Sequence, residues 1–386
     1  MGNFFAYYQT REQVVQLAGR TLRLVVKPGL PDGEWLPAAV HLLAETVSPG
    51  ERVLVVGVGA GALAAYLALR GPVCLADSNH LALQLTRLTL KANHLPPAEV
   101  VGLPLAPQSF DTVAMHLPKG RKLARRWLVE VHAALSDGGT LYLAGANPAG
   151  IQSALDDAKS LFGNLTLLRY GKGNRVARLH KDPRWLAAPG WASEPGIARD
   201  SWYEWELRAR GIPYRLRTLP GVFAYDHLDE GTALLLENLP TMPRERVLDF
   251  GCGYGILGMA AAHQGAEGVD LVDVDLLAVA SARENLTVNR IPNGRVLPSD
   301  VLQAVADQRY TLIVSNPPFH AGRSVEYVMS ETFIRHASAL LEKGGSLILV
   351  ANRFVRYERL MQAVFGNAAL VAQTGKFHIW KARQQR

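Results

Sequence analysis

The chain has 386 residues, of which 48% are apolar and 19% charged. This composition is typical of a globular protein and excludes disorder, collagen and coiled coil as the main architecture, while the length predicts two or three domains. With 41 Lys and Arg against 34 Asp and Glu, the formal net charge is +7, which suggests a polyanionic partner.

The cysteine content and the first residues of the sequence bear on the expected metal content and cellular compartment. Cys74 and Cys252 are far apart in the sequence, so neither a disulfide framework nor a cysteine-based zinc site is expected, and we predict no metal. The first residues lack a basic stretch followed by an apolar run, and no run of about 18 apolar residues occurs. We therefore expect a cytoplasmic protein with no membrane partner.

An internal repeat organises the chain. Val53–Gly61 resembles Val247–Gly255 at an offset of 194, and further pairs follow in the same order with offsets up to 206. Matching segments in the same order and at a nearly constant offset indicate a duplicated domain. The further pairs are Val73–Asp77 with Val269–Asp273, Phe110–Ala114 with Tyr310–Val314, and Gly138–Leu143 with Gly344–Leu349.

Each copy alternates short apolar runs with amphipathic helical stretches. Such alternation predicts an α/β fold of two tandem Rossmann-like domains, each a mostly parallel doubly wound sheet. Each copy ends in two strand-like segments around a short glycine-containing turn, which predicts a terminal antiparallel hairpin. These segments are Leu165–Leu168 with Arg175–Leu179, and Ala369–Gln373 with Lys376–Ala382.

A glycine loop marks a candidate ligand site in the second copy. Gly251, Gly253 and Gly255 follow a predicted strand and open a helix, where glycine permits positive φ and a close approach of ligand. This spacing differs from the dinucleotide fingerprint Gly-x-Gly-x-x-Gly. Asp249 suits a ligand with a cationic amino end, such as S-adenosylmethionine, and would repel a pyrophosphate. The alternative is a tight strand-to-helix turn without a ligand.

Acidic residues follow the next two predicted strands. Asp273 ends the second strand, where an acid typically accepts hydrogen bonds from ribose hydroxyls. Asp300 follows the third strand and is a candidate acceptor for the adenine amino group; the alternative is a loop or capping aspartate. Asp275 is predicted to cap the helix Leu276–Asn289, and Asp229 a helix that ends near Leu239.

The most specific motif follows the fourth apolar strand, and consists of Asn316, Pro317, Pro318 and Phe319. An exocyclic amine on a base ring is a poor nucleophile. A side-chain amide oxygen and a backbone carbonyl can each accept one of its N–H bonds, which orients the nitrogen lone pair. The prolines fix the turn and offer no competing donor, and the aromatic ring can stack on a flipped base. The alternative is a rigid turn with a core phenylalanine.

With these residues the second copy resembles Class I S-adenosylmethionine-dependent methyltransferases, and the whole chain resembles the two-domain ribosomal RNA guanine-N2 methyltransferases. The resemblance is strongest over Leu219–Ala382. It implies methylation of guanine N2 in rRNA, most often 16S, with S-adenosylhomocysteine as product and rRNA, the small subunit or an assembly intermediate as partner. By this resemblance four residues close the methionine end of the cofactor site: Phe223, Asp229, Gly231 and Thr232.

Two features depart from the pattern or rest on position alone. Thr311 stands where an acid often precedes the fourth strand, and Asp300 is carried over only by its position. Other functions stay open beside the main one. They are guanine-N2 methylation of large-subunit 23S rRNA, adenine-N6 DNA methylation, glutamine methylation of a protein, and a non-enzymatic RNA-binding or ribosome assembly factor.

The first copy lacks the residues that carry this chemistry. Val55 replaces Asp249, and at an offset of 200 the catalytic motif becomes His116-Leu117-Pro118-Lys119. We therefore expect three regions: residues 1–182 as a degenerate methyltransferase-like domain, 183–218 as a linker or extension, and 219–386 as the catalytic domain. Because the two copies form an internal pseudo-dimer, we expect a monomer.

The positive charge belongs to the degenerate half. Residues 1–190 contain 20 Lys and Arg against 13 Asp and Glu, whereas residues 191–386 contain 21 of each. A basic cluster in this half predicts an RNA-docking surface, the alternative being a solvated helix face. The cluster consists of Lys119, Arg121, Lys122, Arg125 and Arg126.

Overall fold

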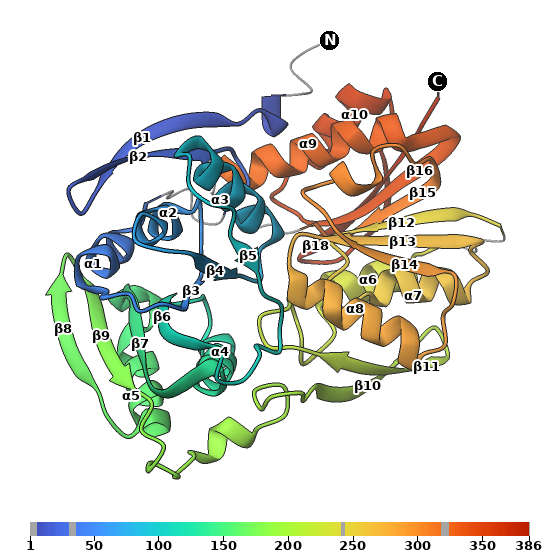
Figure 1. The fold of residues 1–386 in the computed structure, drawn as a ribbon. Helices are drawn as coiled ribbons and strands as arrows, with labels where there is room; N and C mark the ends of the chain where they lie inside the picture. Colours follow the sequence, from blue (N-terminus) through green and yellow to red (C-terminus); the bar gives the residue numbers. More distant parts are fainter. Residues whose placement is uncertain (1–5, 31–35, 241–243, 318–323, 386) are drawn as a thin grey trace. The chain divides into compact units, whose positions relative to one another are not determined.

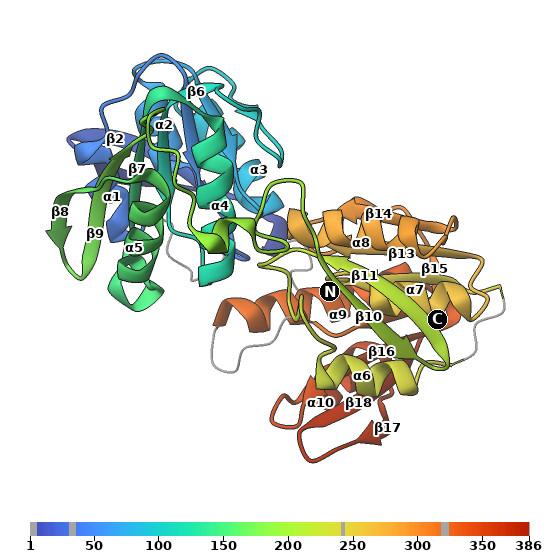
Figure 2. The ribbon, with the colours of Figure 1, turned by 90° about the horizontal axis from the view of Figure 1, so that it is seen from below.

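The computed structural model describes residues 6–30, 36–240, 244–317 and 324–385. The chain forms two compact units (Figures 1 and 2). The N-terminal unit comprises Thr10–Trp202, and the C-terminal unit combines Met1–Gln9 with Tyr203–Arg386. The chain therefore passes between the two units twice, after Gln9 and after Trp202.

The N-terminal unit is built on a seven-stranded sheet of order β5-β4-β3-β6-β7-β9-β8, in which β9 runs antiparallel to both of its neighbours. The strands are β3 (Val53–Val56), β4 (Val73–Ala76), β5 (Glu99–Val100), β6 (Phe110–His116), β7 (Leu135–Ala146), β8 (Thr166–Gly171) and β9 (Asn174–His180). The helices are α1 (Ala38–Thr46), α2 (Ala62–Ala68), α3 (His80–Ala92), α4 (Arg121–Ala134) and α5 (Ile151–Phe162). A separate hairpin, β1 (Arg11–Leu17) with β2 (Arg20–Val26), precedes them.

The C-terminal unit repeats this topology with the order β14-β13-β12-β15-β16-β18-β17. Its strands are β12 (Arg246–Phe250), β13 (Gly268–Asp273), β14 (Gly294–Pro298), β15 (Tyr310–Ser315), β16 (Leu341–Asn352), β17 (Ala369–Gln373) and β18 (Phe377–Arg383). Its helices are α6 (Glu230–Glu237), α7 (Ile256–His263), α8 (Leu276–Val288), α9 (Ser324–Leu340) and α10 (Tyr357–Phe365). The prediction of two Rossmann-like domains, each with a terminal antiparallel hairpin, is confirmed.

A further hairpin in the C-terminal unit differs from expectation. β10 (Tyr203–Ala209) pairs with β11 (Ile212–Thr218) within the stretch that the sequence predicts as linker or extension. The turn consists of Arg210 and Gly211 with φ of 51° and 82°, and two successive positive φ values match the right-handed twist of paired strands. This turn geometry sets the strand pairing.

The compact units divide the chain differently from the expected regions at two places. Ala6–Tyr8 (η1) lies with the C-terminal unit, where Tyr7 is 4% exposed. β10 and β11, which lie in the stretch expected as linker or extension, also belong to this unit. β11 is held to α8 because the Asn289 side chain bonds both backbone groups of Arg215, with Oδ1 accepting at 3.0 Å and Nδ2 donating at 2.7 Å.

The same docking contact occurs in the N-terminal unit, which shows how closely the two copies correspond. Asn93 follows α3 and bonds both backbone groups of Arg23 on β2, at 3.0 and 2.7 Å. Thr311, which stands where an acid often precedes the fourth strand, also makes a contact that both units share. Thr311 Oγ1 accepts a hydrogen bond from the Arg246 amide at 2.9 Å, as the Asp111 carboxylate does from the Arg52 amide at 3.0 Å.

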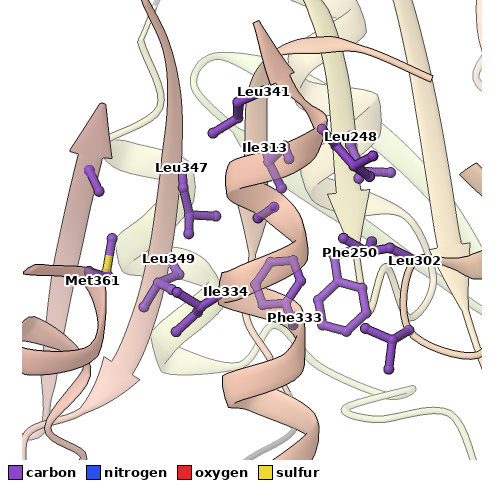
Figure 3. Packing of buried hydrophobic residues seen from close by; sticks show 14 of the residues in the cluster. Leu248, Phe250, Leu302, Ile313, Phe333, Ile334, Leu341, Leu347, Leu349 and Met361 are labelled. Carbon is purple, nitrogen blue, oxygen red and sulfur yellow. The ribbon is translucent and has the colours of Figure 1, made fainter. Parts of the chain in front are cut away.

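The core of the C-terminal unit joins the sheet to α9. Phe250 at the end of β12 stacks on Phe333 of α9, with ring centroids 3.9 Å apart and an interplanar angle of 15° (Figure 3). Phe333 is fully buried, among Leu302, Ile313 and Leu349. This packing fixes the strand end from which the glycine loop leaves. In the described part of the chain, no helix combines the length and apolar character needed to span a bilayer.

Replacing Phe333 tests how much this core contributes to the free energy of unfolding. Phe333→Ala should lower the free energy of unfolding by about 3–5 kcal/mol because it removes a stacked ring and leaves a cavity. Phe354→Ala is the matched control: Phe354 is 63% exposed, so the change should stay within about 0.5 kcal/mol. Denaturant unfolding measures both. Equal values for the two variants would contradict this description of the core.

Candidate active site

The glycine loop between β12 and α7 is tightly held at its base and open above. The amides of Gly251 and Cys252 both donate to the Val272 carbonyl, at 2.9 and 3.1 Å. Gly253 has a φ of 54°, and a Cβ atom added there would meet no atom within 4 Å. At Gly255, a Cβ would lie 3.1 Å from Leu271. The loop therefore packs against the fold on one side and exposes its backbone on the other.

Asp249 lies buried at the end of β12 and has an unused acceptor. Its Oδ2 accepts from the Gly258 amide at 2.9 Å, whereas its Oδ1 has no hydrogen-bond partner among the described residues. Burial, together with the charge of Asp273, raises the pKa of this carboxyl to about 7, although the hydrogen bond from Gly258 acts in the opposite direction. An uncompensated buried acceptor costs stability, which indicates a place reserved for a donor on a ligand.

Asp273 braces the same loop. At the end of β13 its Oδ2 accepts from the Gly253 amide and its Oδ1 from the Asp275 amide, both at 2.9 Å. Asp77 makes the equivalent bonds in the N-terminal unit, to Val58 and Asn79 at 2.7 and 2.8 Å. Bracing is therefore a property of the fold in both copies, and Asp249 is what distinguishes the second copy.

Asn316 follows β15 with its amide held in one orientation. Its Nδ2 donates to Asp229 Oδ2 at 2.9 Å and to Thr232 Oγ1 at 2.8 Å. Asp229 also caps α6, accepting from the Thr232 amide at 2.9 Å, as the sequence predicted. Because these oxygens take up the amide nitrogen, the Asn316 Oδ1 points away from them as an acceptor.

The remaining predicted residues are distributed around this centre. Phe223 is 61% exposed, and Pro317 is buried directly after Asn316. Gly231 lies against the Phe377 ring, to which an added Cβ would approach within 3.2 Å. Asp300 is 3% exposed after β14, and the predicted cap Asp275 accepts from the Leu277 amide at 2.9 Å. Pro318 and Phe319 lie outside the described residues.

Two supporting residues escaped the sequence reasoning. Ser315 Oγ donates to the Phe250 carbonyl at 2.8 Å and ties together the strand ends that carry Asn316 and the glycine loop. Asn285 on α8 donates to the Tyr254 carbonyl at 2.9 Å inside the glycine loop and accepts from the Arg217 amide at 2.7 Å. A signal existed for Asn285, because a polar Thr89 stands at the matching helical position of the first copy.

The first copy cannot repeat the arrangement. Val56 pairs with Met115 in the register in which Phe250 pairs with Ser315, so His116 occupies the place of Asn316. Val55, fully buried, occupies the place of Asp249. The buried carboxylate and the side-chain amide of the second copy are therefore absent at these two places. Among the residues that the structure describes, no group of His, Cys, Asp and Glu is arranged to hold a metal ion.

The basic cluster on α4 is largely engaged within its own unit. Arg121 and Arg125 each bond both oxygens of Asp157 on α5, at 2.8 to 3.0 Å. Arg126 is 5% exposed and donates to the Gly196 carbonyl at 2.6 Å. Lys119 and Lys122 are exposed on the surface. Three of the five residues thus hold structure together.

The sheet order, the glycine loop and the oriented Asn316 define a Rossmann-like methyltransferase. The methyltransferase small domain family matches residues 23–178 and 213–381, once in each copy. A Pseudomonas entomophila (strain L48) relative named ribosomal RNA small subunit methyltransferase C is 37% identical over 283 residues, covering 73% of this chain and 81% of the relative. A relative of the same name from Psychromonas ingrahamii is 33% identical over 272 residues, covering 70% and 75%.

A solved structure extends the likeness over both units. The T. thermophilus 16S rRNA N2 methyltransferase in complex with AdoMet and guanosine matches with a TM-score of 0.83 and 31% identity, covering 99% of this chain and 100% of that one. The chain belongs to the methyltransferase small domain family and, within it, to the ribosomal RNA small subunit methyltransferase C proteins. The resemblance indicated by the sequence is confirmed.

The contacts of α4 generate a stability prediction. Arg126→Ala should lower the free energy of unfolding by roughly 3 kcal/mol, because it removes the donor from the Gly196 carbonyl and one of two cations from the buried Glu130 carboxylate. Lys119→Ala removes a neighbouring exposed charge and should change it by less than about 0.5 kcal/mol. Thermal or denaturant unfolding distinguishes the two. An unchanged free energy of unfolding in Arg126→Ala would show that the contacts of this buried arginine contribute little to stability.

Proposed function

We propose that this protein transfers a methyl group from S-adenosylmethionine to N2 of a guanine in 16S rRNA. The observation that carries the proposal is the orientation of Asn316, whose amide nitrogen is held by Asp229 and Thr232. The acceptor oxygen is thereby available to an amine. Membership of the small subunit methyltransferase C family supports the choice of rRNA.

The residues around the glycine loop fit the cofactor. The unpartnered Oδ1 of Asp249 matches the α-amino group of a methionine moiety, and the open face above Gly253 gives room for a ligand against the backbone. We assign Asp273 to the ribose hydroxyls and Asp300 to the adenine amine. Bound there, S-adenosylmethionine supplies the methyl group as a sulfonium and leaves as S-adenosylhomocysteine.

The chain's own residues position the amine. Asn316 Oδ1 and the Pro317 carbonyl each accept one N–H bond from guanine N2, which directs the nitrogen lone pair toward the methyl donor without a strong base. Asp229 and Thr232 prevent the Asn316 amide from rotating, since rotation would break two hydrogen bonds. Pro318 is assigned to shaping the turn and Phe319 to stacking on the flipped base, both on sequence grounds.

The wider setting follows from this assignment. We assign the N-terminal unit to RNA docking and take the small subunit or an assembly intermediate as substrate, a monomer as the working form and the cytoplasm as its place. A 23S rRNA target is the competing reaction. A non-enzymatic assembly factor is the competing class, and the buried acceptor of Asp249 disfavours it, because a protein that binds no cofactor would bear the stability cost of this acceptor without a ligand donor to satisfy it.

The decisive experiment is mass-spectrometric mapping of N2-methylguanosine in rRNA incubated with the protein and labelled S-adenosylmethionine. The native protein should methylate 16S rRNA, at guanosine 1207 if its target is that of the T. thermophilus relative. Asn316→Ala should lower turnover roughly a hundredfold or more, because a preorganised acceptor is lost. Because Asn316 is also predicted among the cofactor-binding residues, the affinity of this variant for S-adenosylmethionine should fall as well, but by much less than its turnover.

Three results would contradict the proposal. Methylation confined to 23S rRNA would shift the target, and near-normal turnover of Asn316→Ala would exclude the mechanism. Absence of S-adenosylmethionine binding by the native protein in calorimetry would revive the assembly-factor hypothesis. Glu358→Gln serves as the control variant, since it alters an exposed residue of α10.

The raised pKa of Asp249 predicts a pH dependence of cofactor affinity. Only the ionised carboxylate attracts an ammonium group, so protonation through a pKa of about 7 weakens binding as pH falls. Affinity should decline by close to tenfold per pH unit below about 7 and change little just above it. Calorimetric titration from about pH 5.5 to 7.5 measures the profile. Asp249→Asn should bind more weakly with a flat profile; the same slope in that variant would assign the titration to another group.

A further inference from the structure

The first described residues of the chain complete the core of the C-terminal unit. Ala6–Tyr8 precedes the whole N-terminal unit in sequence, yet Tyr7 is 4% exposed among the buried residues around Phe250 and Leu302. Two hydrogen bonds anchor the segment. Tyr7 Oη donates to Asp300 Oδ1 at 2.9 Å, across 293 positions of sequence, and Tyr8 Oη lies 3.0 Å from His336 Nδ1 on α9.

Asp300 is therefore not a free loop aspartate. Its carboxylate is 3% exposed and bonded to a phenol that is itself buried, so its rotation is restricted. The next residue, Val301, has a φ of 52°. A β-branched side chain is costly in this left-handed region, and such strain persists only where the surroundings enforce it. Packing on both sides thus fixes the backbone and the carboxylate of this turn.

The N-terminal unit offers an internal comparison. The segment that precedes β10 includes Arg199 and still belongs to the N-terminal unit. It packs on α4 and on the turn that contains Leu105, the counterparts of α9 and of the turn at Asp300. Arg199 donates to the Leu105 carbonyl at 2.6 Å and approaches Glu130 on α4 within 3.4 Å. At the offset of 196 that relates Asp77 to Asp273, Pro104 stands where the second copy has Asp300. Both copies are closed by such a segment, but only the second joins it to a carboxylate at the candidate cofactor site.

We propose that Tyr7 is a positioning residue of the cofactor site, which orients the Asp300 carboxylate toward the exocyclic amine of adenine. This inference rests on the proposed function, in which Asp300 accepts from that amine. Tyr7 acts only through Asp300 and is not a catalytic residue. The segment Ala6–Tyr8 then contributes to the choice of a 6-aminopurine over a 6-oxopurine.

The test uses the full chain and compares S-adenosylhomocysteine with S-inosylhomocysteine, whose purine carries an oxygen in place of the amine. The native protein should prefer the adenine ligand. Tyr7→Phe removes the hydroxyl and should reduce that preference between about threefold and tenfold, the range expected for one oriented hydrogen bond. Asp300→Asn should reduce it at least as much. Affinities come from calorimetry, with thermal unfolding of each free protein recorded beside them.

Tyr8→Phe is the matched control, because it removes the neighbouring hydroxyl from His336 and leaves the bond to Asp300. It should keep the native preference, even if its unfolding temperature falls. A purely structural role for Tyr7 would weaken both ligands equally in Tyr7→Phe and leave the ratio unchanged, which would overturn this inference alone. An unchanged ratio in Asp300→Asn would also overturn it. Failure of the native protein to bind either ligand would overturn the proposed function as well.

Discussion

The Asp229 carboxylate serves two parts of the C-terminal unit at once. One oxygen caps α6 by accepting from the Thr232 amide, and the same oxygen accepts from the Asn316 side chain. Helix position and amide orientation are therefore a single constraint. A shift of α6 would release the amide, and rotation of the amide would bring its oxygen against the Asp229 carboxylate, where two acceptors repel each other. The orientation of the Asn316 amide therefore needs no separate support, because a helix cap already supplies it.

The two copies show how one fold is kept while the residues of the candidate site change. Both keep the sheet order, the positive φ values of the glycine loop and the aspartate that braces it. These features maintain a tight strand-to-helix connection, which any sheet of this kind requires. The residues that differ are two acceptors of the candidate site, Asp249 and Asn316, replaced by Val55 and His116. Valine at the buried strand end avoids the free-energy cost of an unpaired buried carboxylate.

Much of this could be predicted from the sequence, for physical reasons that also explain the failures. The strands, the terminal hairpins and the caps at Asp229 and Asp275 depend on patterns within a few residues, and these predictions are confirmed. The β10–β11 hairpin was not predicted, because Arg210-Gly211 is a weaker turn signal than Asn-Gly or Asp-Gly. The engagement of Arg121 and Arg125 depends on Asp157 in the next helix, and the bond of Tyr7 to Asp300 joins residues 293 positions apart. Such contacts leave no periodic signal. The roles assigned to the individual site residues stay predictions.

The discontinuity of the C-terminal unit has a consequence for how the protein is made. Tyr7 is synthesised 293 positions before the turn that receives it. Until then the N-terminal unit can fold on local and intermediate contacts, while the segment ahead of it waits without a partner. The core of the C-terminal unit is therefore completed late, because its contact with Tyr7 joins residues far apart in the sequence. The conformational entropy of closing this long loop is lost only after most of the chain has been synthesised. The turn at Asp300 therefore receives Tyr7 only after translation has passed residue 300.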